Sequence, residues 1–99
     1  MPLATAAKVE VLRVLVRAGR TARSSLTAEG CDLIVDTCAS VAAMGPTLPG
    51  DAARATRAAV ELFLAHDCPT VHPRLRHDLA LAVHDVVRRR SAAEHQHRD

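Results

Sequence analysis

Residues 8–17 read KVEVLRVLVR, and the architecture of the whole chain depends on whether this stretch is a helix or a strand. Its valines suit a strand, and such a strand could pair with its copy in a second chain. The flanking residues favour a helix, because Thr5 can cap its start and Gly19 can end it. Arg17 near that end suits the negative pole of the helix dipole. We predict a helix here, and the strand is the alternative.

A helix over this stretch is apolar on most of its circumference. One face carries Val9, Leu12 and Val16, and the other side carries Val11, Val14 and Leu15. Such a helix is buried on several sides, and a four-helix monomer would leave part of that surface in water. We therefore predict a homodimer. Its predicted interface consists of Val11, Val14, Leu15 and Leu81, the last being an apolar residue on the outer side of the final helix.

The composition favours an all-α fold. Alanine, the best helix former, is abundant, and Phe63 is the only aromatic residue among 99. This length fits one domain, and we assign residues 1–91 to a single helical domain and 92–99 to a polar tail. A core of this size provides a small margin of stability, which oligomerisation, a disulfide or a metal ion would increase.

Three further helices are expected, and the first of them begins near Ser25. It runs to about Met44, where the sequence GPTLPG ends it. Thr27 is a less suitable cap, because Gly30 stands where a capping box has Glu or Gln.

The last two helices also have local start signals. Asp51 caps the third helix, which runs to about His66. The fourth begins at Thr70 or His72 and runs to about Arg90. Similar lengths and short links predict an antiparallel four-helix bundle. The apolar stripes of these three helices predict core positions at Cys31, Ile34, Val35, Cys38, Val41 and Ala42, at Ala52, Ala55, Ala59, Leu62, Phe63 and His66, and at Leu75, Leu79, Ala82, Val83 and Val86.

The stretch HDCPTVHP, residues 66–73, has two interpretations. As a helix connection, it places His66 at the end of one helix and His72 at the start of the next, and Cys68 is a small core residue. As a metal site, it offers ligands that zinc or copper accepts, namely His66, Cys68 and His72. Cys31 would be a further ligand, because a hairpin turning near residue 47 places it about one helical turn from Cys68. The H-x-C-x3-H spacing matches no established zinc pattern, so we prefer the connection.

The remaining features narrow the function without specifying it. The sequence has no Gly-rich phosphate loop, no G-x-S-x-G and no H-E-x-x-H, so we expect no enzyme. With one aromatic residue and a net charge of +2, a nucleic-acid partner is unlikely. Charges interrupt the first apolar stretch, so we expect no membrane span and a cytoplasmic location with free cysteines. We predict an interaction or oligomerisation module without a cofactor. The alternative is a metal- or redox-responsive regulator that uses the Cys and His residues named above.

Overall fold

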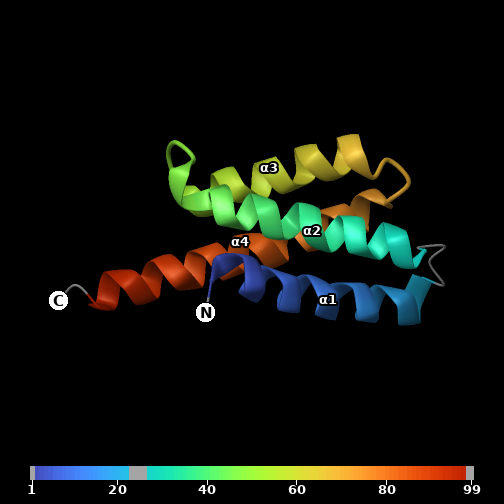
Figure 1. Cartoon of the computed structure of the whole chain (residues 1–99), viewed down its shortest axis with the longest axis horizontal. Coiled ribbons are helices and arrows are strands. Elements are labelled where there is room, and N and C mark those ends of the chain that lie inside the picture. Colours follow the sequence, from blue (N-terminus) through green and yellow to red (C-terminus); the bar gives the residue numbers. More distant parts are fainter. Residues whose placement is uncertain (1, 23–26, 98–99) are drawn as a thin grey trace.

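The chain folds as four α-helices that run alternately in opposite directions (Figure 1). The computed structural model describes residues 2–22 and 27–97, with side chains for 2–18 and 27–90. The helices are α1 (Leu3–Ala22), α2 (Ala28–Met44), α3 (Ala52–Asp67) and α4 (Pro73–His97), and the short 3-10 helix η1 (Gly45–Thr47) follows α2. The described residues contain no strand, so the helix predicted over residues 8–17 is confirmed and the strand alternative is wrong. The antiparallel all-α bundle predicted from composition and spacing is also confirmed.

Three helix ends differ from the prediction. α1 begins at Leu3, before Thr5, and continues through Gly19 to Ala22. A glycine inside a helix costs about 1 kcal/mol relative to alanine, which the packing of α1 against its neighbours outweighs. α4 continues to His97, beyond Arg90, near which we expected it to end. The segment after residue 90 contains neither proline nor glycine, so nothing local ends the helix there.

The first turns of α2, α3 and α4 are each held by a side chain. Thr27 Oγ1 accepts a hydrogen bond from the Gly30 amide at 3.0 Å, so Thr27 caps α2 although Gly30 breaks the capping-box pattern. The bond needs only the backbone N–H of Gly30. Ser25, which we expected in this role, lies outside the described residues. Asp51 Oδ1 accepts from the amides of residues 53 and 54 and caps α3, as predicted. The last of the three caps is made by His72 (below).

The core lies where all four helices meet. α3 packs most extensively on α4, and α1 packs on both α2 and α4, whereas α2 and α3 contact each other less. The largest fully buried side chains are Ile34, Leu64, Leu79, Val11, Val41, Val60, Val83 and Val87. The core positions predicted on α2 and α4 are buried or half-buried.

Two of the residues predicted for a dimer interface belong to this core. Val11 is 0% exposed and Leu15 is 8% exposed, because both face the other helices of the same chain. Val14 is half-buried and packs against the same cluster. Val11 and Leu15 are therefore unavailable to a second copy, and that part of the prediction is wrong. Leu81 does lie at the surface, at 39% exposure.

The core face of α3 differs from the predicted one. Leu62 and Phe63 are exposed to 69% and 40%, whereas Val60 and Leu64 are fully buried. The side chain of His66 is also exposed. Alanines occur on every side of α3, so the apolar pattern fits more than one stripe. Packing on α4 selects the stripe that carries the two bulky residues Val60 and Leu64.

Candidate functional site

Residues 66–73 form the connection between α3 and α4. His66 Nδ1 lies 2.8 Å from Asp67 Oδ1, and the side chain of His66 is 85% exposed. The chain leaves the helix at Cys68, whose amide donates to the carbonyl oxygen of residue 64. His72 Nδ1 accepts a hydrogen bond from the Arg74 amide at 3.1 Å, so this imidazole caps α4. His72 thus has a local role in starting a helix, whereas Cys68 and Val71 of this connection belong to the core.

The four predicted metal ligands do not form a site in this arrangement. His66 extends into solvent, Cys68 is buried, and His72 uses Nδ1 to cap a helix. Cys31 packs against the core from α2. Across the part of the chain that the structure describes, no three His, Cys, Asp or Glu side chains group closely enough to hold a metal ion. Binding of zinc or copper stays a prediction, which elemental analysis of protein purified without chelator would test.

The buried thiols are poor nucleophiles. Burial, together with a smaller contribution from the neighbouring Cys68, raises the pKa of the Cys38 thiol to about 12. Burial also raises the pKa of Cys68, with a smaller contribution from the Asp67 carboxylate. Because the thiolate is the reactive form, both groups are poor nucleophiles near neutral pH. All three cysteines are free thiols in the structure.

The connection between α2 and α3 is longer than the tight turn near residue 47 from which we expected Cys31 to lie beside Cys68. Cys68 lies close enough to Cys38 to affect its titration, although we expected it beside Cys31. Val41 and Met44 of α2 line the same hollow as Phe63 of α3. The helix η1 and the residues that follow it separate the two α-helices, so α3 is displaced along α2 relative to a tight hairpin.

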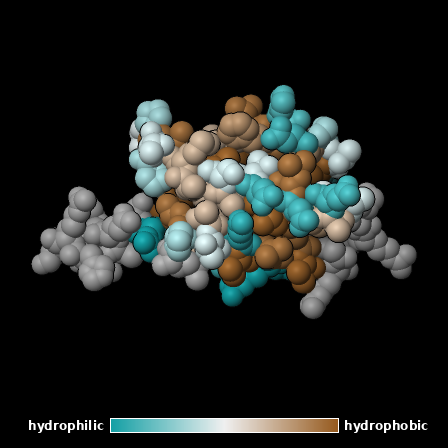
Figure 2. Space-filling view, in the orientation of Figure 1, coloured by the Kyte–Doolittle hydropathy of each residue, from teal (hydrophilic) through white to brown (hydrophobic). Residues whose placement is uncertain are grey.

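The first surface feature is an apolar strip on α1 that we call the α1 ridge, consisting of Val9, Leu12 and Val16. These side chains are 40%, 49% and 59% exposed. Their spacing of three and four residues places them on one side of the helix, next to the side that carries Val11 and Leu15. Figure 2 shows hydrophobic side chains at the surface in the region of α1, in the lower part of the view. α1 is therefore apolar on two neighbouring sides, and the core covers the one that carries Val11 and Leu15.

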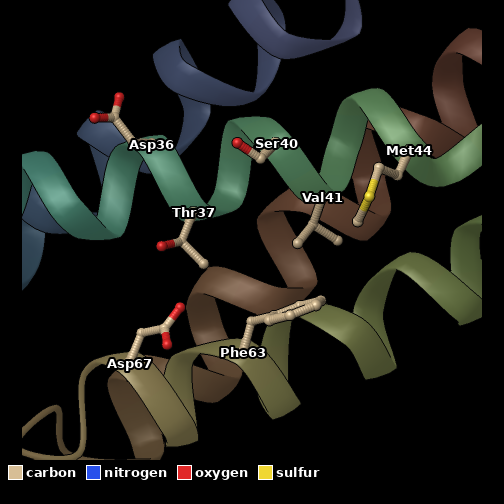
Figure 3. Close-up of a pocket in the computed structure, with 7 residues that line it drawn as sticks. All are labelled: Asp36, Thr37, Ser40, Val41, Met44, Phe63 and Asp67. Carbon is tan, nitrogen blue, oxygen red and sulfur yellow. The ribbon is translucent and has the colours of Figure 1, made fainter.

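The second surface feature is a hollow of about 330 Å³ between α2 and α3, which we call the α2–α3 groove. It opens where the two helices pack less closely. In Figure 3, Phe63 extends from α3 toward Val41 and Met44, and the Asp67 carboxylate points toward Thr37. The groove is lined by Asp36, Thr37, Ser40, Val41, Met44, Phe63 and Asp67.

The groove was not predicted from the sequence. We expected Phe63 in the core, and we did not connect the acidic residues of α2 with Asp67. The one sequence feature that could have indicated the groove is Phe63, the lone aromatic residue, which lies one helical turn before Asp67.

Leu81 is isolated on the outer side of α4. Two polar neighbours, His77 and His84, lie on the same side of the helix, and His77 Nδ1 lies 3.2 Å from Glu61 Oε1. A single exposed leucine of this kind requires no functional explanation. None of the described helices is both long and apolar enough to cross a lipid bilayer.

Comparisons with protein-family models, with curated proteins and with solved structures find no match for this chain. Any proposal about its function therefore depends on its own residues, and chiefly on the two surface features just described.

Proposed function

We propose that this chain is a helical self-association module without catalytic activity, and that the α1 ridge is part of its interface. The supporting observation is the position of the ridge. Val9, Leu12 and Val16 lie outside the core-facing side of α1, so the fold of one chain leaves them about half exposed. Their regular spacing gives a continuous apolar strip, which is the arrangement that packs against another helical surface.

The size of the ridge indicates what kind of surface it needs. Fully burying a Val or Leu side chain is worth about 1.5–3 kcal/mol, and these three are roughly half buried already. Completing their burial would contribute about 3 kcal/mol in total. Association costs at least about 4 kcal/mol in lost translational and rotational freedom. The ridge therefore needs a partner surface that adds apolar contacts of its own.

The proposal is tested by the mass of the protein in solution. Light scattering at micromolar concentration is expected to give a mass above that of one 10.6 kDa chain. Leu12→Asp places a charge in the middle of the ridge and is expected to return the mass to that of a monomer. Leu81→Asp is the matched control, because Leu81 is a similarly exposed leucine outside the ridge.

A monomeric wild-type protein at these concentrations would overturn the proposal. Equal loss of association in Leu12→Asp and Leu81→Asp would also count against it, because the effect would then not be specific to the ridge. Circular dichroism of each variant separates loss of association from loss of the helical fold.

A further inference from the structure

The α1 ridge lies between positive charges. Lys8 is on one side of the strip, and Arg13 is on the other. Arg13 pairs with Glu10 at 3.0 Å and stays 66% exposed. A contact between two α1 ridges would place the lysines and arginines of both copies near one another. Like charges disfavour such a contact, whereas an acidic partner surface would favour it.

The α2–α3 groove has the opposite charge. Asp36 is at one side of it, on α2, and Asp67 is at the end of α3. Among the residues whose side chains are described, no basic one lines it. Both carboxylates lie toward one end of the groove, and Met44 and Phe63, each about 40% exposed, provide apolar contact area toward the other end (Figure 3).

The two surfaces are complementary in shape as well as in charge. The ridge is a row of side chains that extend from one helix, and the groove is a hollow between two helices (Figure 3). A third helix laid along a groove between two others is a common packing arrangement, in which apolar anchors repeat every three to four residues. Val9, Leu12 and Val16 have that repeat.

We infer that the α1 ridge of one copy docks in the α2–α3 groove of a second copy. The inference depends on the proposed self-association and names the surface that receives the ridge. The contact joins two different surfaces, so each chain has one ridge and one groove through which it binds other copies. Apolar side chains of the ridge meet Met44 and Phe63, and the cations beside the ridge approach Asp36 and Asp67.

The decisive experiment combines two variants that each damage one surface. Leu12→Asp leaves the groove intact, and Phe63→Glu leaves the ridge intact. Each variant alone is expected to be monomeric in light scattering at micromolar concentration. An equimolar mixture is expected to form a 1:1 complex, because the ridge of the Phe63→Glu protein meets the groove of the Leu12→Asp protein. Met44→Glu serves as a second groove variant if circular dichroism shows that Phe63→Glu is unfolded.

The results separate this inference from the proposed function. If both groove variants associate like the wild type and Leu12→Asp does not, the ridge binds another surface; the inference then fails while self-association stands. If the folded variants do not associate when mixed, the inference also fails. If the wild-type protein is monomeric, both the proposed self-association and this inference are wrong.

Charge gives an independent test. Lys8→Glu and Asp36→Lys are each expected to weaken self-association about five- to tenfold, and mixing them is expected to restore it in part. Arg54→Glu is the control, since Arg54 is exposed on α3 but lines neither surface. Lys8→Glu and Arg54→Glu lower the net charge by the same two units, so an equal effect of these two substitutions would show that net charge matters rather than position and would overturn the specific pairing.

Discussion

Gly45 is a position where the structure makes a sharp prediction. This residue is buried at the start of η1, where the end of α2 meets α3 and α4. A Cβ atom added to Gly45 would lie 2.6 Å from Thr56 Oγ1 and 3.6 Å from the nearest methyl of Val87. Thr56 cannot move aside easily, because it is fully buried and its hydroxyl donates to the Ala52 carbonyl oxygen at 2.6 Å. Gly45→Ala therefore forces the packed elements apart.

Two opposing effects set the magnitude. Overpacking of this kind costs about 1–3 kcal/mol. Gly45 has φ −47° and ψ −50°, which alanine adopts readily. Alanine also makes the unfolded chain less flexible, and this effect stabilises the folded protein by about 0.4–1 kcal/mol. The net expectation is a loss of about 1–2 kcal/mol in the free energy of unfolding. For a chain of this size, such a loss lowers the Tm by about 4–15 °C.

The assay is urea unfolding followed by circular dichroism at one fixed protein concentration, for a double-mutant cycle with Thr56→Ala. Removing Oγ1 makes room for the new methyl, so Gly45→Ala is expected to cost about 1 kcal/mol less in the Thr56→Ala background. Thr56→Val keeps an atom at that place and is the control without rescue. A Gly45→Ala protein as stable as the wild type, or equal costs in all three backgrounds, would refute the steric argument.

The remaining predictions concern thiol titration, capping and the face of α3. Because folding raises the pKa of Cys38 from 9.0 to about 12, its contribution to stability is complete below pH 9 and is lost as the pH rises toward 12. Urea unfolding at several pH values is expected to show a decline of up to about 1.4 kcal/mol per pH unit above pH 9, and a shallower one in Cys38→Ala. Asp51→Ala removes the cap of α3 and is expected to cost about 1 kcal/mol, whereas Asp51→Asn, which keeps a capping oxygen, costs less. Leu64→Ala is expected to cost about 2–5 kcal/mol. The change Leu62→Ala, two residues away on the exposed side, is expected to cost less than about 1 kcal/mol; similar losses at both positions would mean that the core face of α3 is assigned wrongly.

The connection between α3 and α4 shows what local sequence can specify. Either Thr70 or His72 was predicted to cap α4 at this connection, and His72 makes the hydrogen bond. Asp51 was predicted in the same way to cap α3, and it does. Such signals are readable because the interacting groups are two or three residues apart in the chain. The candidate metal site could not be judged in the same way, since it required His66, Cys68 and His72 to come together in space, and no such group of ligands forms among the described residues.

The α1 ridge shows where sequence becomes ambiguous. The pattern of residues 8–17 predicted a helix with apolar residues on two sides, and both sides are apolar in the structure. It did not indicate which side faces the core, because Val9 and Val11 are equally hydrophobic. We placed Val11 and Leu15 at the interface, and the structure places them inside.

By itself, the sequence determined the helices, the cap of α3, the choice of Thr70 or His72 for the cap of α4, and the antiparallel order, because propensity, capping and short links act over a few neighbouring residues. Only the tertiary structure decided which side of α1 and α3 is buried. It also decided that Phe63 and Asp67 meet the α2 residues that line the groove. Those outcomes depend on the rotation and displacement of whole helices against one another. Packing of bulky side chains such as Val60 and Leu64 sets that rotation, and no short stretch of sequence contains both partners of such a contact.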